Sequence, residues 1–165
     1  DVAAVAKNLG EPSSANSTNT AGNSLLYEAV SSSDLAVARL LLAKGADPNA
    51  RDCRGSTPLI AAAEFASLPV LELLVEAGAD VPTGNQYGRS ALHNAAKRED
   101  PVVTKFLIAH GARLNQVCEY GTPLDLTANR GIAEVLRAAG GSESATKSIA
   151  SRTHQSYLTK LPSTE

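Results

Sequence analysis

Apolar side chains recur along the chain at the spacing of helices. In three stretches, a valine is followed three and four residues later by two large apolar residues. Residues three and four apart lie on one face of a helix, so each stretch predicts a helix with one buried face. The members are Val37, Leu40 and Leu41; Val70, Leu73 and Leu74; and Val103, Phe106 and Leu107.

Polar residues and glycines bound each of these predicted helices. A short oxygen-bearing side chain precedes each helix and can accept the free backbone N–H groups of its first turn. A glycine follows each apolar run, where the left-handed conformation that ends a helix costs glycine little. The predicted N-caps are Asp34, Ser67 and Asp100, and the predicted ends are Gly45, Gly78 and Gly111.

The whole pattern repeats every 33 residues, as Gly22, Gly55 and Gly88 also show. Ahead of the predicted helices lie further helical segments with small side chains, which allow neighbouring helices to approach closely. These small residues include Ala62, Ala63, Ala95 and Ala96. A period of this length predicts stacked two-helix units, each of which buries its apolar face against its neighbours.

The openings and endings of the units carry a more specific signal. The second, third and fourth units open with STPLIAAA from Ser56, RSALHNAA from Arg89 and GTPLDLTA from Gly121. The first, second and third units end with KGADPN, EAGADV and HGARLN. This combination resembles the ankyrin repeat family. The resemblance implies an all-α solenoid of helix-turn-helix units joined by short β-hairpin-like turns. It also implies that His93 is structural and bonds backbone groups between repeats.

We expect the array to cover residues 24–141, in units 24–50, 51–83, 84–116 and 117–141. The first unit has Ser24 and Leu25 where Thr and Pro are expected, so its opening turn is irregular. The last unit lacks about one helical turn between Thr122 and Gly140, which predicts a C-terminal cap. Its polar outer face would consist of Arg130, Glu134 and Arg137.

The two ends of the chain lie outside this pattern. Residues 1–23 are expected to form an N-terminal segment, with a short helix at 1–9 and a mobile linker at 11–23 that is rich in Ser, Thr, Asn and Gly. Residues 142–165 form a polar tail. The tail is either solvated or a helix that docks on the array or on a partner, and the sequence does not decide between them.

Composition narrows the function. The 15 Lys and Arg residues against 17 Asp and Glu leave a net charge of −2, so nothing attracts a phosphate backbone over long range. We therefore expect no nucleic-acid partner. No apolar run approaches the ~20 residues that span a bilayer, so no membrane insertion is expected either. The missing initial Met leaves open that the chain is a fragment or a processed product.

Titratable residues offer little chemistry. The three histidines are His93, His110 and His154, and no phosphate-binding loop, paired-cysteine motif or nucleophile elbow accompanies them. His110 precedes Gly111, where its ring would complement the last carbonyls of a helix. We expect no catalytic residues, no metal site and no cofactor, and therefore no enzyme activity.

The two cysteines bear on compartment. Cys53 and Cys118 are predicted to occupy equivalent positions two repeats apart, on turns that are expected to be exposed, which places them roughly 20 Å from each other. A disulfide needs α-carbons within ~7 Å, so both are expected to be free. Free cysteines suit an intracellular, cytoplasmic location, whereas a secreted or periplasmic protein remains an alternative.

The resemblance implies a partner-binding face at the turn tips and the exposed side of the first helices. The candidate residues there are Arg54, Ser56, Phe65, Tyr87, Arg89, Lys97, Arg98, Glu119 and Tyr120. Aromatic rings and arginines of this kind often anchor interfaces. Exposed Arg and Lys are also ordinary on a solvated face, and Phe65 could instead pack against Leu68.

Two functions fit these observations. The first is a monomeric, non-catalytic module that binds a protein partner of acidic or mixed surface through the concave face, as a regulator, inhibitor or effector. The second is a targeting or substrate-docking domain cut from a larger multidomain enzyme or channel. The identity of the partner does not follow from the sequence.

Overall fold

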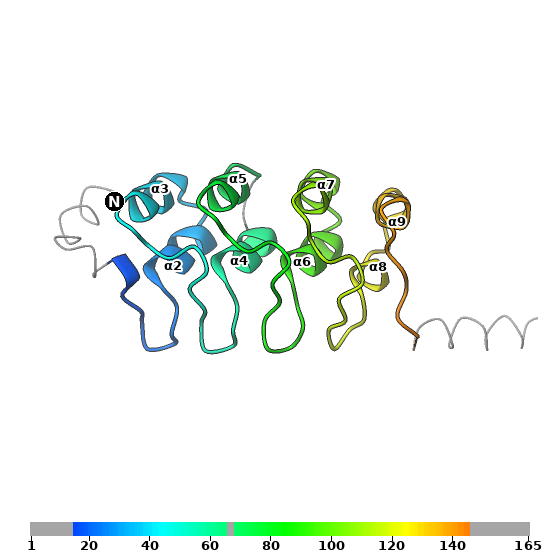
Figure 1. Cartoon of the computed structure of the whole chain (residues 1–165), viewed down its shortest axis with the longest axis horizontal. Coiled ribbons are helices and arrows are strands. Elements are labelled where there is room, and N and C mark those ends of the chain that lie inside the picture. The colour runs from blue at the N-terminus through cyan, green and yellow to red at the C-terminus, as the bar shows by residue number, and fades with distance from the viewer. Residues whose placement is uncertain (1–14, 66–67, 146–165) are drawn as a thin grey trace, which may run out of the picture.

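A computed structural model describes residues 15–65 and 68–145 of the chain. Its helices lie in two rows that run along the molecule (Figure 1). The first helices of the successive repeats are α2 (Leu25–Ser31), α4 (Pro58–Phe65), α6 (Ala91–Arg98) and α8 (Pro123–Leu126). The second helices are α3 (Leu35–Ala43), α5 (Leu68–Glu76), α7 (Pro101–Ala109) and α9 (Arg130–Ala138). The all-α solenoid expected from the sequence is confirmed.

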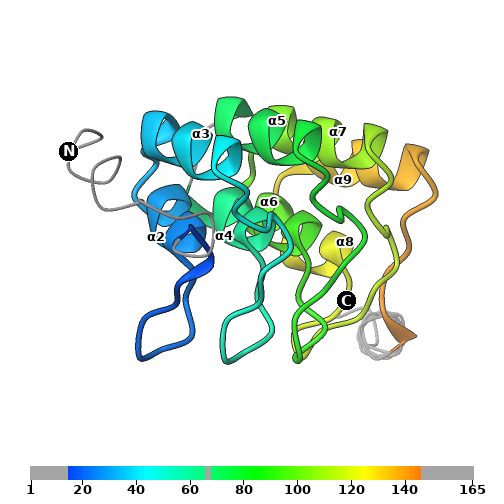
Figure 2. The ribbon, with the colours of Figure 1, turned by 60° about the vertical axis from the view of Figure 1, so that its left-hand side comes forward.

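Hairpin-like loops project from the row of first helices (Figure 2). Isolated antiparallel bridges join Thr18 to Ser24, Gly84 to Ser90 and Cys118 to Gly121, and a backbone hydrogen bond of 3.0 Å from Asp52 to Ser56 closes the second loop. We call these loops fingers 1 to 4. They comprise residues 18–24, 52–56, 84–90 and 118–121.

The helices begin and end largely where the sequence predicts. Asp34 accepts from the N–H of Val37, and Asp100 accepts from the N–H groups of the first turn of α7. The predicted cap Ser67 lies outside the described residues. The irregular opening of the first repeat still has a cap, because the side chain of Ser24 accepts from the N–H of Tyr27. Gly45, Gly78 and Gly111 adopt φ of 85°, 90° and 85°, as the predicted helix ends require.

The core lies between the two rows and between successive repeats. Leu41, Leu74 and Leu107 are fully buried on the second helices, as predicted. Ala62 and Ala95 are fully buried on the first helices, where α4 packs against α6. Small side chains at these positions let the first helices approach each other closely. The repeats therefore stack as one continuous core.

Residues 15–23 correct the expectation of a mobile linker. Ala15 is fully buried, and the side chain of Asn16 donates to the carbonyl of Gly45 and accepts from the N–H of Asp47. This segment builds finger 1 and packs on the first repeat. Its Ser, Thr, Asn and Gly content reflects turn formation as much as mobility. The expected helix at residues 1–9 lies outside the described residues, and the predicted repeat boundaries stay predictions.

An asparagine recurs at each of three repeat junctions. Asn49 donates to the carbonyl of Gly78 and accepts from the N–H of Asp80, just as Asn16 does one repeat earlier. Asn115 makes the same two bonds to Gly140 and Ser142. The position in this register between Asn49 and Asn115 is Pro82, which has no side-chain amide. The junction that follows Pro82 therefore lacks this bridge.

The fourth repeat is shortened as expected. Helix α8 has 4 residues, whereas α6 has 8, and α9 closes the array. On the outer side of α9, Arg130 pairs with Glu134 at 3.0 Å and Arg137 pairs with Glu143 at 3.3 Å. Both pairs are largely exposed, so they contribute little to stability.

Candidate partner-binding cleft

Each finger is held by a side-chain acceptor at its start. Asn19 accepts from the N–H groups of Ala21 and Asn23, and Asp52 accepts from those of Arg54 and Ser56. In finger 3, Asn85 accepts in the same way from the N–H groups two and four residues ahead, at 3.0 Å each. Such bonds fix a turn locally without a neighbouring strand. The fingers therefore present their tip residues in a defined direction.

Cys118 occupies this same register in finger 4, which corrects its predicted position. It lies 33 residues after Asn85, and its sulfur accepts from the N–H of Tyr120 at 3.4 Å. Cys118 is buried, whereas Cys53 is exposed, because Cys53 lies one position further along finger 2. The two cysteines are therefore not equivalent. Both are free, as predicted.

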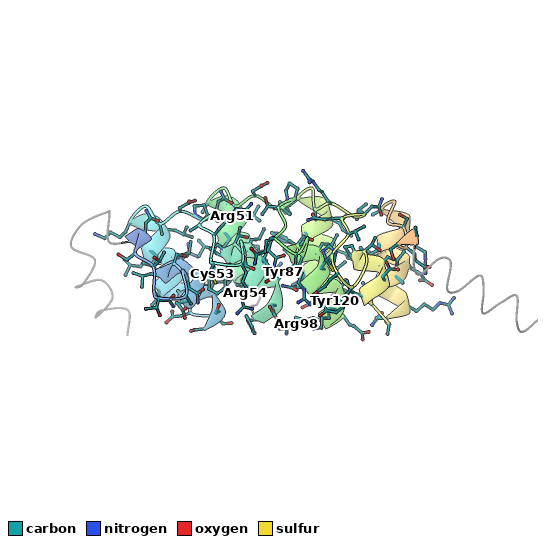
Figure 3. The ribbon with its side chains drawn as sticks, turned by 90° about the horizontal axis from the view of Figure 1, so that it is seen from below. Arg51, Cys53, Arg54, Tyr87, Arg98 and Tyr120 are labelled. Atoms are coloured by element: carbon teal, nitrogen blue, oxygen red, sulfur yellow. The ribbon has the colours of Figure 1, made fainter. Side chains whose placement is uncertain are left out.

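The tip side chains form a row across the repeats. Arg54, Tyr87 and Tyr120 lie at successive 33-residue positions and run along the finger side of the molecule (Figure 3). Half of Tyr87 and 63% of Tyr120 are exposed. Aromatic side chains with this exposure offer apolar area to a partner at little entropic cost.

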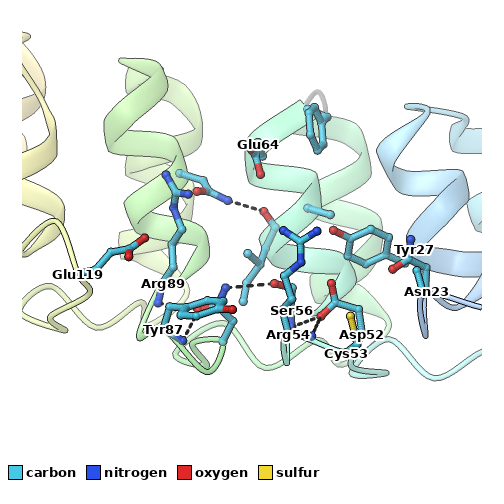
Figure 4. Close-up of a pocket in the computed structure, with 16 residues that line it drawn as sticks. Asn23, Tyr27, Asp52, Cys53, Arg54, Ser56, Glu64, Tyr87, Arg89 and Glu119 are labelled. Carbon is cyan, nitrogen blue, oxygen red and sulfur yellow. Dashed lines mark hydrogen bonds between the residues drawn. The ribbon is translucent and has the colours of Figure 1, made fainter.

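A cleft of about 440 Å³ lies between the fingers and the first helices. Figure 4 shows its wall residues: Tyr27 and Asp52 lie toward the first repeat, Arg54 lies between the first and third repeats, and Arg89 and Glu119 lie toward the fourth. The structure places six of the predicted site residues on this cleft. They are Arg54, Ser56, Phe65, Tyr87, Arg89 and Glu119.

The other predicted residues lie next to the cleft. Lys97 and Tyr120 line a neighbouring depression of about 350 Å³ together with Arg89. Arg98 lies outside both, and its guanidinium donates to the carbonyl of Glu64 near the end of α4. Arg98 thus joins α6 to α4 and is only partly available to a partner. Phe65 is 53% exposed, so the alternative that Leu68 covers it is wrong.

Ser56 was predicted as an exposed contact residue, and this is wrong. Its side chain is buried, and its hydroxyl accepts from the side-chain amide of Asn85 at 3.2 Å. That bond joins finger 2 to finger 3. Ser56 therefore supports the cleft wall rather than offering a contact surface.

Several cleft residues were missed by the sequence analysis, and three of them are polar residues of the wall and floor. Tyr27, Asp52 and Asn94 line the cleft, and Asn94 is 2% exposed on α6. Burial raises the pKa of Tyr27, and the negative charges of Asp52 and Glu64 raise that pKa further. The signal that could have identified Tyr27 and Asn94 is their place on the same face of the first helices as the predicted contact residues.

The cleft charges are not neutralised within the described part of the chain. No ion pair within 4.0 Å joins Arg54 or Arg89 to a carboxylate there; the pairs present lie on the C-terminal cap. The Nε of Arg89 and the Oδ1 of Asn94 are buried and make no hydrogen bond with the described residues. A buried polar atom without a partner is unfavourable unless water or a bound molecule pairs with it.

His93 has the structural role that the resemblance implies. Its Nδ1 accepts from the N–H of Ser90 at 3.1 Å, and its Nε2 lies 3.2 Å from the carbonyl of Gly121 in the next repeat. Burial, the largest influence, lowers the pKa of His93 below its ordinary value. His110 also acts as predicted, because its Nδ1 lies 2.8 Å from the carbonyl of Phe106 at the end of α7.

The described residues 15–65 and 68–145 contain no group of three or more His, Cys, Asp and Glu residues that could hold a metal ion. No helix in these ranges is long and apolar enough to cross a membrane. The cleft is lined by hydrogen-bonding, charged and aromatic groups.

The fold consists of stacked two-helix units with projecting fingers and a cleft along one side. This architecture is that of helical repeat arrays, a class of proteins that bind other proteins along one extended face. A family model of ankyrin repeats in three copies matches residues 1–85, and a second model of ankyrin repeats in many copies matches residues 74–126. The chain belongs to the ankyrin repeat family. Comparison with curated proteins gives no match. Ankyrin repeats are in general protein–protein interaction modules.

Proposed function

We propose that this chain binds a protein partner in the cleft between fingers 1–4 and the first helices, and acts by occupying that partner. The observation that carries this proposal is the composition of the cleft wall. Half-exposed Tyr87 and Phe65 lie there beside arginines that have no carboxylate partner among the described residues. Buried aromatic anchors supply most of the affinity at interfaces, whereas charges govern encounter and specificity.

The cleft serves equally in a free-standing regulator and in a docking domain of a longer protein. No catalytic function is proposed.

The test is affinity capture of partners from the source cells with the full chain, followed by surface plasmon resonance on variants. Tyr87→Ala and Phe65→Ala are expected to weaken binding of the captured partner by about 1–3 kcal/mol each, mainly through faster dissociation. Val102→Ala is the matched control, because Val102 is also an exposed apolar residue, at 56%, and lies outside the cleft.

Binding that survives both cleft substitutions and disappears when residues 146–165 are deleted would assign recognition to the tail. That outcome would overturn the proposal. Equal losses in Tyr87→Ala and in the Val102→Ala control would also count against the cleft, because they would indicate a loss of folded protein.

A further inference from the structure

We infer that the occupant of the cleft is an extended protein segment with one acidic side chain flanked on both sides by basic side chains. The acidic side chain lies between Arg54 and Arg89. This inference rests on the proposed function, and it adds the chemistry of the segment that the cleft selects.

The positive centre of the cleft is the first observation. Arg54 extends from finger 2 and Arg89 follows the tip of finger 3, and both line the cleft (Figure 4). Within the described residues, neither guanidinium donates a hydrogen bond to a protein acceptor, and the Nε of Arg89 is buried. A carboxylate that accepts from a guanidinium group forms short, charge-assisted hydrogen bonds, and it gives the unpaired Nε donor of Arg89 an acceptor.

Negative charge on both walls is the second observation. Asp52 lies on the wall toward the first repeat and Glu119 on the wall toward the fourth, whereas Glu64 lies near the end of α4 (Figure 4). Asp52 uses its Oδ1 to hold finger 2, but its charge remains. The charged finger residues of the cleft therefore run along the array as negative Asp52, positive Arg54 and Arg89, and negative Glu119. A complementary segment carries the opposite order, and phosphate groups would be repelled by the two walls.

The floor of the cleft favours a polypeptide over a free ion. The side-chain amide of Asn94 donates to the carbonyl of Ile60 at 2.9 Å, which fixes the orientation of the side chain between α6 and α4. Its Oδ1 is then left as a buried acceptor with no partner among the described residues. An extended backbone offers an N–H donor at regular intervals, and such a donor would satisfy this oxygen.

The repeat spacing sets the spacing of the motif. Neighbouring packed helices lie ~10 Å apart. An extended chain advances ~3.3 Å per residue, so about three residues separate positions that face adjacent repeats. The expected segment therefore has an acidic residue, two intervening residues and a basic residue toward Glu119, with a second basic residue on the side of Asp52.

Selection from a random dodecapeptide library displayed on phage tests this inference. The full chain, Arg89→Gln and Arg89→Glu serve as three separate targets. Peptides enriched on the full chain are expected to carry the basic–acidic–basic pattern, with one basic residue three positions from the acidic residue. Selection on Arg89→Glu is expected to replace the central acidic residue by a basic or neutral one, because the cleft centre loses its positive charge.

The enriched peptides are then synthesised, and their dissociation constants are measured by fluorescence anisotropy. Arg89→Gln is expected to weaken binding at least tenfold, since it removes a charge-assisted pair. Arg39→Gln is the matched control, because Arg39 is an exposed arginine on α3 outside the cleft, and this variant should bind within twofold of the parent. Circular dichroism melts verify that all variants fold.

Three outcomes would overturn the inference: no enrichment, enriched peptides without an acidic residue, and enriched peptides that bind Arg89→Gln as tightly as the parent. These outcomes separate the inference from the proposed function. If captured proteins still depend on Tyr87 and Phe65, the cleft binds proteins and only the charged-segment inference fails. If Tyr87→Ala and Phe65→Ala also leave capture unchanged, both fail.

Discussion

The third and fourth repeats begin their first helices with the same hydrogen-bond arrangement but different side chains. In the third repeat, the N–H of Ser90 donates to the Nδ1 of His93 at 3.1 Å. In the fourth, the N–H of Thr122 donates to a carboxylate oxygen of Asp125 at 2.9 Å. In both repeats the residue three positions after the cap accepts from the cap, as in a capping box.

The difference lies in what the rest of each side chain contacts. Because Nδ1 of His93 accepts, its Nε2 carries the proton and donates to the carbonyl of Gly121 in the next repeat. Asp125 only accepts, and its second contact is the N–H of Ser144, at 2.8 Å, where the chain returns after α9. An internal repeat thus uses a group that donates to its neighbour. The final repeat uses a group that accepts from the segment that follows α9.

The largest expected effect is that of His93→Ala. This change removes a fully buried ring and leaves the N–H of Ser90 and the carbonyl of Gly121 each without this partner. We expect a loss of about 3 kcal/mol in the free energy of unfolding, from a cavity and unpaired polar groups. Urea denaturation followed by circular dichroism gives the value. His110→Ala should cost much less, since His110 is exposed; equal losses would contradict the bridging role of His93.

Asp125→Ala comes next. It leaves the N–H groups of Thr122 and Ser144 without their acceptor, at a half-buried position. We expect a loss of about 1–2 kcal/mol, smaller than for His93→Ala because water reaches these groups more easily. Hydrogen exchange resolved by NMR should show the loss of protection at the Ser144 amide. Unchanged protection there, with intact global stability, would mean that Asp125 does not hold the end of the array.

The helix stack is the part of the fold that the sequence predicts well. Apolar spacing, caps such as Asp34 and Asp100, and the helix-ending glycines each have a direct physical reason and recur at one period. His93 follows from the family resemblance. The apolar spacing, the caps and the helix-ending glycines depend on contacts within one repeat, so a single sequence displays them.

The finger register is harder to recognise because different residue types perform the same role. Asn19, Asp52, Asn85 and Cys118 all accept from the N–H two residues ahead, yet the residue type changes from Asn to Asp, back to Asn and then to Cys. The polar composition of residues 11–23 likewise favoured a linker, although residues 15–23 include finger 1.

Burial of single tip residues depends on the adjacent repeat and cannot be assigned from one repeat alone. Ser56 is buried because Asn85 of the next finger covers and bonds it. Arg98 is occupied by a carbonyl on α4, one repeat earlier. The cleft could therefore be located from the sequence, but its wall residues could not be separated into contact and support residues.

A pH titration sharpens the comparison of His93 with Asp125. Burial lowers the pKa of His93 below 6.5, so the unfolded chain binds a proton before the folded one. The stability contributed by neutral His93 is full above pH 6.5 and is lost as the pH falls from there toward the folded pKa. We expect the stability difference between the parent and His93→Gln to shrink by about 1 kcal/mol between pH 7.5 and 5.5.

Asp125 has the opposite chemistry and a lower pH window. Burial alone would raise its pKa, but the hydrogen bonds from Thr122 and Ser144 outweigh burial and lower the pKa below 3.8. Its contribution is full above pH 3.8 and is lost as the pH falls further, through the folded pKa. The difference between the parent and Asp125→Asn should therefore stay constant between pH 7.5 and 5.5. If this difference in stability changes between pH 7.5 and 5.5, a group other than His93 causes the loss of stability near neutral pH.

The smallest expected effect concerns finger 4, where the sulfur of Cys118 replaces the oxygen found in the other fingers. Thiol sulfur is a weak acceptor, and its bond to the N–H of Tyr120 is long, at 3.4 Å, compared with 2.9 Å from Arg54 to Asp52. Cys118→Asp should restore the oxygen acceptor in finger 4 and raise the free energy of unfolding by roughly 0.5 kcal/mol, the low end for one hydrogen bond. The reciprocal change, Asp52→Cys, should lower stability by at least as much, because Asp52 accepts two such bonds. Paired urea denaturation curves of the two variants measure both signs at once. A loss of stability in both variants would show that the burial of Cys118, rather than its bond to the backbone, determines the residue at this position.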